Sequence, residues 1–342
     1  MALIAAFVAF SGQGDSLGAE LDAIALKANL PGMGVMVVTS HGESWSHFYG
    51  VKKTGEPEVV DSETRWHLGS CTKAMTAAVV SRFVEDKKLN LNAPLKKVFP
   101  EFKVDSGYEK VTLRHLLAHQ GGMVANINWG ALNGSLVEVR VEAVKQLLES
   151  PPATEVGKFV YSNSGIVVAG YAAEKASGKP IETLLTEEFK EMGILDFGFG
   201  PTLKGESWPH LEGKPVSVNG DNPPVLTAAG RANMTLSDWG KWISENLKGL
   251  IGKESTLPKL YFEEIRSKSL GGDYAMGWIV TSRPWAGGLA LTHSGSNTVN
   301  FCSTWVAPGK DFAVLFVTNT AGKDTAKVAD DCVTAVIRSN LK

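Results

Sequence analysis

Residues 70–84 read SCTKAMTAAVVSRFV, and the prediction of the fold starts from them. Apolar residues recur every four positions from Met75 to Phe83 with small alanines between them, which is typical of a helix with one buried face. At the start of this helix Ser70 and Lys73 stand three positions apart, so their side chains share a face. The stretch therefore predicts a buried helix that carries a serine hydroxyl within reach of a lysine amine.

Short β-rich runs lie near both ends of the chain, and helical patterns lie between them. The runs with strand character cover residues 32–39 and 45–49 and, after Asp238, residues 276–281, 289–292, 299–306 and 312–318. The helical patterns cover residues 17–26, 111–117, 139–148, 165–176, 181–192 and 324–337. The predicted class is α/β in the α+β sense, an antiparallel sheet flanked by helices with an all-helical domain inserted. The sheet domain would comprise residues 14–69 and 227–342, the helical domain residues 70–226, and a cleft would lie between them.

The composition excludes several classes of protein. Of the 342 residues, 44% are hydrophobic and 20% charged, which is enough for one large or two ordinary domains with a core. The 34 Lys and Arg against 36 Asp and Glu leave a formal charge of -2 without a run of like charges, so no nucleic-acid partner is predicted. No segment reaches the length of a transmembrane helix, which argues against stable membrane insertion.

The first ten residues, MALIAAFVAF, followed by Ser11 and Gly12, are similar to the apolar part of a secretion signal. No Lys or Arg precedes them, as one does in a complete signal. Residues 1–12 are therefore either a signal-peptide remnant, which predicts a periplasmic or secreted protein, or the first element of a cytoplasmic one.

Three other patterns resemble functional sites and have simpler explanations. Residues 14–18 read GDSLG, but none of the histidines has an Asp three positions before it, so Ser16 is better explained as part of a helix-capping loop than as a nucleophile. His115 and His119 have zinc-ligand spacing, but Leu116 stands where that motif needs Glu. No metal or cofactor is predicted. The cysteines, Cys71, Cys302 and Cys332, are too few for a disulfide scaffold, and a Cys302–Cys332 bridge stays open.

Ser70 and Lys73 are suited to nucleophilic catalysis. A serine becomes a nucleophile when a base takes its proton, and a lysine amine can be that base if burial lowers its pKa. The apolar helix supplies such burial. A serine at a helix amino end also has its own N–H and the helix dipole near a developing oxyanion. The same S-x-x-K spacing recurs at residues 339–342, where nothing follows that would bury the lysine.

Two further motifs complete a pattern that resembles a known superfamily. Ser70-x-x-Lys73, the single Y-x-N at residues 161–163 and, among three H-x-G sequences, the one at residues 293–295 on a predicted inner strand follow in this order. Together they resemble the serine hydrolases that include class C β-lactamases, D,D-carboxypeptidases and family VIII carboxylesterases. Residues 112–122, 229–239 and 274–278 look like that superfamily's intervening segments. The resemblance covers nearly the whole chain and implies a β-lactamase/transpeptidase-like fold with the active site in the interdomain cleft.

The resemblance also implies a role for each matched residue. Ser70 would attack the acyl carbon and form an acyl-enzyme, with Lys73 as its base. Tyr161 would exchange protons with the leaving group and the deacylating water, its phenol made more acidic by Lys73. Asn163 would orient the substrate or Lys73. The backbone N–H groups of Ser70 and Ser296 would form the oxyanion hole.

Motif three bears on the substrate. His293 and Gly295 stand where classical β-lactamases have Lys-Thr-Gly, and a histidine is mostly neutral at pH 7. This favours a carboxylesterase that acts on small or medium acyl esters, with weak β-lactam hydrolysis. A β-lactamase, D,D-carboxypeptidase or D-aminopeptidase acting on amides stays open, as does a non-catalytic relative that binds peptidoglycan or β-lactams. Trp129 and Trp285 are predicted to line an apolar acyl pocket, and Trp278 either lines it or belongs to the core.

Overall fold

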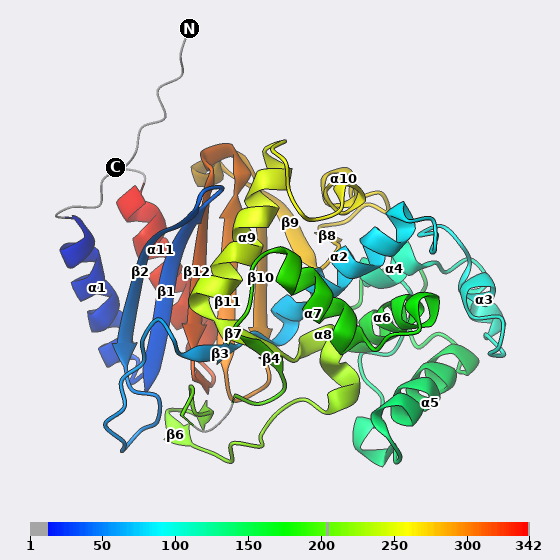
Figure 1. Ribbon diagram of the computed structural model, residues 1–342, viewed down its shortest axis with the longest axis horizontal. Helices are drawn as coiled ribbons and strands as arrows, with labels where there is room; N and C mark the ends of the chain where they lie inside the picture. Colours follow the sequence, from blue (N-terminus) through cyan, green and yellow to red (C-terminus); the bar gives the residue numbers. More distant parts are fainter. Residues whose placement is uncertain (1–12, 203–204, 341–342) are drawn as a thin grey trace, which may run out of the picture.

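The computed structural model describes residues 13–202 and 205–340, with a seven-stranded antiparallel sheet of order β2-β1-β12-β11-β10-β9-β8 at its centre (Figure 1). The strands are β1 (Gly32–Thr39), β2 (Gly42–Gly50), β8 (Tyr274–Ala275), β9 (Trp278–Arg283), β10 (Gly288–Ser296), β11 (Phe301–Ala307) and β12 (Phe312–Thr318). Met33 of β1 pairs with Thr318 of β12, so both ends of the chain contribute to the centre of one sheet, as the sequence predicted.

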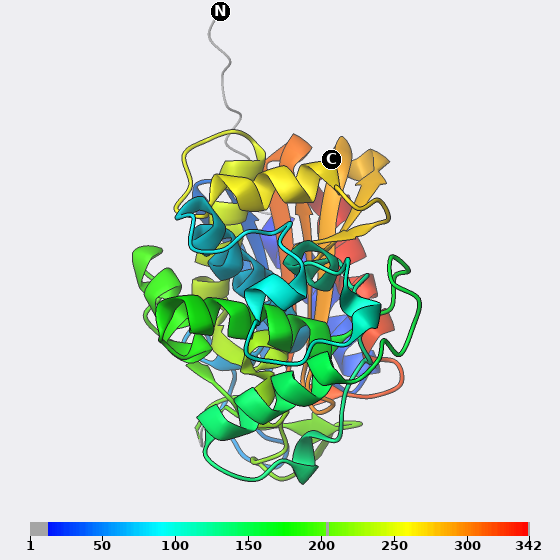
Figure 2. The ribbon, with the colours of Figure 1, turned by 90° about the vertical axis from the view of Figure 1, so that its right-hand side faces the viewer.

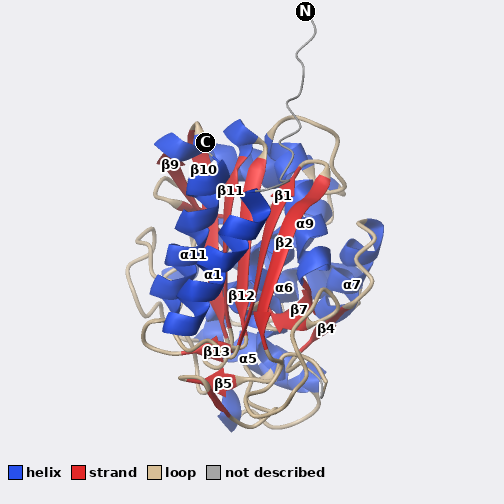
Figure 3. Cartoon of the chain, turned by 90° about the vertical axis from the view of Figure 1, so that its left-hand side faces the viewer, coloured by secondary structure: helices blue, strands red, loops and turns tan. Residues whose placement is uncertain are grey.

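Two helices from opposite ends of the chain cover one face of this sheet, α1 (Gln13–Lys27) and α11 (Thr325–Asn340) (Figure 3). Strand β1 is buried on both faces and divides its side chains between two cores. Val35 and Val37 pack in the cluster under α1 and α11, whereas Met36 and Val38 face the main core. This alternation follows from the two-residue period of a strand.

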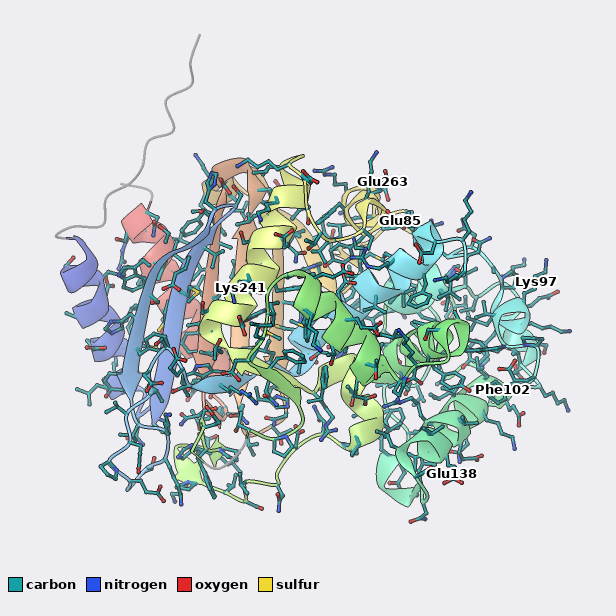
Figure 4. The ribbon with its side chains drawn as sticks, viewed as in Figure 1. Glu85, Lys97, Phe102, Glu138, Lys241 and Glu263 are labelled. Atoms are coloured by element: carbon teal, nitrogen blue, oxygen red, sulfur yellow. The ribbon has the colours of Figure 1, made fainter. Side chains whose placement is uncertain are left out.

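The other face carries the remaining helices, which extend away from the sheet as a helical region (Figures 1 and 2). They are α2 (Thr72–Glu85), α3 (Leu95–Val98), α4 (Leu113–Leu117), α5 (Leu136–Glu149), α6 (Asn163–Ser177), α7 (Ile181–Glu191), α8 (Thr227–Gly230), α9 (Leu236–Leu250) and α10 (Lys259–Ser267). The main apolar cluster is continuous from the sheet through α9 and α2 to α5. Charged side chains such as Lys97, Glu138, Lys241 and Glu263 point outward from these helices (Figure 4).

Two small sheets connect distant segments. One has the order β3-β7-β4, with β3 (Arg65–His67), β7 (Ala232–Thr235) and β4 (Phe197–Phe199); the other has the order β13-β5-β6, with β13 (Thr320–Ala321), β5 (His210–Leu211) and β6 (Lys214–Pro215). Because β3 pairs with β7, the segment just before Ser70 lies beside the segment that follows α8.

The sequence prediction missed α9 and α10, which lie in the part of the chain that follows α8. Helix α9 begins at a Thr235 cap, whose hydroxyl accepts from the N–H of Asp238. It presents apolar residues to the core with helical spacing, from Leu236 through Trp239 and Ile243 to Leu247. The strands of this half begin at β8, close to the predicted run at residues 276–281, and α9 and α10 occupy the stretch before it to which the prediction gave no element.

Cys302 and Cys332 do not form a bridge, because the sheet separates them. Cys302 lies in the main core with its Sγ 3.5 Å from that of Cys71. Cys332 lies in the cluster under α11, with its Sγ 3.8 Å from the sulfur of Met33. All three thiols are free.

The predictions on membrane insertion and on export concern different parts of the chain. Within residues 13–202 and 205–340, no helix combines the length and apolarity needed to cross a bilayer. The proposed signal segment, residues 1–12, lies outside the described residues.

Gly277 tests how closely the sheet packs on α2. Its φ is +86°, and a Cβ there would lie 2.3 Å from the backbone nitrogen of Ala74. Gly55 has a similar φ of +88°, but a Cβ there would meet no atom within 4 Å. Both alanine variants carry the strain of a positive φ, so we expect Gly277→Ala to lose about 1–3 kcal/mol more unfolding free energy than Gly55→Ala. Urea denaturation measures both, and equal losses would contradict the close packing.

Candidate active site

Ser70 lies in the short 3₁₀ turn Gly69–Cys71, which leads directly into α2. Gly69 has a φ of +45°, and a Cβ on it would lie 2.3 Å from the backbone nitrogen of Ser296. A Cβ on Gly295 would lie 2.9 Å from the backbone nitrogen of Ser70. Two glycines thus let this turn contact β10 directly, which brings the N–H groups predicted to form the oxyanion hole into one place.

Lys73 has the geometry and the electrostatics of a general base. Its Nζ is 2.9 Å from Ser70 Oγ and donates to the carbonyl oxygen of Ala229 at 2.6 Å. The side chain is fully buried, and burial lowers its pKa from 10.5 to about 7, against a smaller opposing effect of Cys71. A neutral amine can donate one proton to Ala229 and still accept the proton of Ser70.

Tyr161 lies on the other side of the nucleophile. Its hydroxyl hydrogen-bonds to Ser70, and its ring centre is 4.9 Å from Lys73 Nζ. Burial raises the pKa of the phenol above its usual range, with the Ser70 hydrogen bond opposing this. The expectation that Lys73 makes the phenol more acidic is therefore wrong in this structure, because burial dominates the pKa of Tyr161 and the group that opposes it is Ser70, not Lys73. Tyr161 stays a proton donor, and Lys73 is the group that can accept a proton at neutral pH.

Asn163 occupies the first turn of α6, whose cap is the neighbouring Ser162. Its Nδ2 donates to Asn126 Oδ1 at 3.0 Å, and the same oxygen accepts from Trp129 Nε1 at 3.1 Å. The described hydrogen bonds of Lys73 go to Ser70 and Ala229, not to Asn163. Asn163 and Trp129 are thus joined through Asn126, and Trp129 also packs against the main core. Contact of Asn163 or Trp129 with a substrate stays a prediction.

His293 is buried, and both of its ring nitrogens have internal partners. Its Nδ1 is 2.6 Å from the carbonyl oxygen of Ser294 and must carry a proton to donate to it. Its Nε2 is 3.0 Å from the hydroxyl of Tyr274, whose pKa burial raises well above the usual value. The imidazole is therefore held on both sides by partners inside the protein. The aromatic cluster around it contains His119, Phe159, Tyr161 and Tyr274.

The structure does not bring Trp285 or Trp278 to the site. Trp285 lies in the 3₁₀ turn Pro284–Ala286 at the opposite end of β10 and packs on Trp305, with ring centres 5.8 Å apart. Because β10 advances about 3.3 Å per residue, that end is far from Ser70. Trp278 is a core residue whose Nε1 donates to the hydroxyl of Tyr261 at 2.5 Å. The prediction of Trp285 as a pocket residue is wrong, and the open choice for Trp278 resolves in favour of the core.

The other two candidate sites do not assemble. Ser16 lies in α1, which packs in the core cluster on one side of β1, whereas Ser70 precedes α2 in the main core on the other side. His115 Nδ1 accepts from the backbone N–H of Thr112 at the start of α4, whereas His119 Nδ1 accepts from the N–H of Ser162. The two imidazoles thus have different structural partners.

Two contributors to the site escaped the sequence prediction. Tyr274 was noted as part of a segment that precedes motif three, but its contact with His293 depends on a tertiary fold. The carbonyl of Ala229 holds Lys73, and since any residue offers a carbonyl, no sequence pattern could identify it.

Comparison with known proteins shows the family of the chain. The sequence model of the Beta-lactamase family matches residues 2–336. The protein named "Unguisins hydrolase ungD'" of Aspergillus campestris is 28% identical over 249 residues, which are 64% of this chain and 44% of that protein. "Beta-lactamase" of Escherichia coli is 26% identical over 264 residues, 75% of this chain and 67% of that one. "Esterase EstB" of Burkholderia gladioli is 29% identical over 235 residues, which are 61% of this chain and 59% of that protein. The match thus spans less than two thirds of the first and third of these proteins.

Solved structures confirm the predicted fold. The octameric penicillin-binding protein homologue from Pyrococcus abyssi has a TM-score of 0.78 at 22% identity and covers 95% of this chain and 77% of its own. The structure titled "Crystal structure of SurE" has a TM-score of 0.77 at 21% identity, and the match covers 96% of this chain and 76% of that one. The antiparallel sheet with its helices is therefore a penicillin-binding-protein and β-lactamase-like fold.

The buried lysine predicts the pH dependence of the reaction. Lys73 must be neutral to accept the proton of Ser70, so kcat/KM should rise with pH through an apparent pKa of about 7. We expect Lys73→Ala to lose about 10²–10⁴ in kcat/KM. Lys73→Arg should lose as much, since a guanidinium keeps its proton. Initial rates of ester hydrolysis from pH 5 to 9 measure this. An unchanged profile in Lys73→Ala would exclude Lys73 as the base.

Proposed function

Because the chain belongs to the beta-lactamase family of serine hydrolases, we propose that it is a carboxylesterase which acts on small or medium acyl esters through a Ser70 acyl-enzyme. A weak hydrolysis of β-lactams accompanies this activity. The support comes from the chemistry of motif three and from the side chains around the nucleophile.

The observation that carries the proposal is the state of His293. Both of its ring nitrogens are engaged by Ser294 and Tyr274, so this position offers a substrate no fixed positive charge. In the described part of the chain, the cation in contact with Ser70 and Tyr161 is Lys73, which is only about half protonated at pH 7 because its pKa is about 7. A β-lactam or a D-alanyl peptide carries a carboxylate that needs a counter-charge, whereas a simple ester carries none.

Apolar side chains beside the nucleophile favour an apolar substrate. Phe159 is 50% exposed, Val124 37% and Tyr161 36%, although all three are large hydrophobic residues. Val124 connects to the same segment, since its carbonyl oxygen accepts from the hydroxyl of Ser162. We infer that these side chains supply the apolar part of the surface that binds the acyl group.

The residues divide the reaction into two half-reactions. In acylation, Lys73 takes the Ser70 proton as Oγ attacks the carbonyl carbon, and the N–H groups of Ser70 and Ser296 stabilise the oxyanion. Tyr161 then gives its proton to the leaving alkoxide and regains one from the Lys73 ammonium. In deacylation, water attacks the acyl-enzyme, Lys73 takes the proton of the water, and Ser70 leaves with a proton returned through Tyr161.

A substrate panel tests the proposed function. We compare kcat/KM, divided by each uncatalysed rate, for p-nitrophenyl butyrate, a chromogenic cephalosporin and a D-alanyl-D-alanine peptide. We expect the ester to exceed both amides by at least about 10², and Ser70→Ala to lose about 10³ or more on the ester. A larger value for either amide would replace the esterase with a β-lactamase or a peptidase. If the protein shows no turnover and is not labelled by a fluorophosphonate, the result would indicate a non-catalytic binding protein.

Phe159 tests the acyl-binding surface. Removal of a half-exposed aromatic ring should cost about 1 kcal/mol of apolar contact, or about fivefold in binding. We expect Phe159→Ala to raise KM about fivefold for p-nitrophenyl octanoate and to leave KM for the acetate unchanged. Leu195→Ala is the matched control, since Leu195 is 77% exposed in the segment between α7 and β4. An equal change for both esters would show that Phe159 does not contact the acyl chain.

A further inference from the structure

Asp221 is a buried carboxylate outside the three motifs. It lies in the loop between β6 and α8, and 3% of its side chain is exposed. Its Oδ1 is 2.8 Å from His67 Nε2 and accepts from Asn297 Nδ2 at 3.0 Å, while its Oδ2 accepts from Arg231 Nε at 3.0 Å. Burial raises the pKa of this carboxyl, but these partners outweigh it and keep the pKa below its usual value. The group is therefore an anion at neutral pH.

Each partner of Asp221 belongs to a different segment of the active site. His67 ends β3, three residues before Ser70. Arg231 follows α8, two residues after the carbonyl that holds Lys73. Asn297 directly follows Ser296, the second predicted donor of the oxyanion hole. One carboxylate thus connects the segments that carry the nucleophile, the base and the oxyanion hole.

His67 extends this connection to the backbone of the nucleophile turn. Its Nδ1 accepts from the backbone N–H of Gly69 at 3.1 Å, so the ring proton resides on Nε2. The imidazole is fully buried, and its Nε2 lies 2.8 Å from Asp221 Oδ1 in a close contact that lacks the alignment of a full hydrogen bond. It therefore has no free nitrogen to act as a base for Ser70, whose hydroxyl contacts Lys73 and Tyr161.

We propose that Asp221 and His67 are positioning residues for the hydrolysis: they hold the Gly69–Cys71 turn and the end of β10 in the register that aligns Ser70, Lys73 and the oxyanion hole. This inference rests on the proposed function, because it concerns the same reaction. Neither residue contacts the reacting atoms. Their effect arises because a displacement of about 1 Å in a reacting group costs about 10² in rate.

Conservative substitutions separate the two halves of the bridge. Asp221→Asn keeps an oxygen for His67 and Asn297 but sets an amide N–H against Arg231 Nε–H. His67→Gln can still donate to Asp221 but loses the N–H of Gly69. His67→Asn can still accept from Gly69, two residues ahead, but no longer reaches Asp221.

Glu188 provides a matched control for the loss of a buried charge. Like Asp221 it has 3% of its side chain exposed, and it pairs with Arg82. Arg82 lies in the last turn of α2, nine residues or about 14 Å beyond Lys73. Glu188→Gln should thus lower the melting temperature without disturbing the site.

The experiment measures kcat and KM for p-nitrophenyl butyrate, the rate of fluorophosphonate labelling and the melting temperature of all five proteins. We expect Asp221→Asn and both His67 variants to lose about 10–100-fold in kcat and in labelling rate, with KM within about threefold. Glu188→Gln should stay within about twofold in kcat at a similar loss of melting temperature. If Asp221→Asn does not fold, the two His67 variants decide.

Two results would overturn the inference. One is a kcat within twofold of wild type in the folded variants of Asp221 or His67. The other is a loss of kcat in Glu188→Gln as large as theirs, since the effect would then follow from stability alone. Failure of the proposed function is distinct, because it appears as absent ester turnover in the wild-type protein.

Discussion

The direct contact between the Gly69–Cys71 turn and β10 is the constraint on which the rest of the site depends. Gly69 and Gly295 leave no side chain between the two backbones, so a nucleophile from the helical side and an amide donor from the sheet lie at one point. An oxyanion hole built from two regions exists only when both are packed together. The common apolar core of sheet, α9 and α2 maintains that packing. Packing of the core is therefore a precondition for the geometry of the site in this protein.

Burial of α2 also sets the chemistry of the base. The helix is apolar enough to lie inside the molecule, and the cost of desolvating an ammonium there lowers the pKa of Lys73. The carbonyl of Ala229 gives the amine a partner without giving it a counter-charge. The same low dielectric raises the pKa of Tyr161, so burial separates the two groups into a base and an acid.

The sequence predicted those parts of the fold and site that depend on local pattern. The strand runs, α2 and the three motifs are local, and the structure brings Ser70, Lys73, Tyr161 and His293 together. Helix α9 was missed although its pattern is local, whereas the misses in the site depend on tertiary contacts. Trp285 was predicted to line the pocket, yet it lies just before the start of β10, whereas His293 and Gly295 lie near the other end of that strand. The thiol neighbours Cys71 and Cys302 and the bridge from Asp221 likewise join residues far apart in the chain.

The pairing of β1 with β12 has a consequence for the order of folding. Met33 contacts its partner Thr318 only after almost the entire chain has been made, whereas α2 to α7 come from one continuous stretch and pack on one another within it. Non-local strand pairs close late and slowly, because the loop between them must first be ordered. During synthesis the helical region can collapse early. Strands β1 and β2 form a hairpin whose edge toward β12 stays unpaired and exposed until β12 has been made. The nascent protein is thus most exposed to aggregation and to chaperone binding in the interval before β10 to β12 emerge.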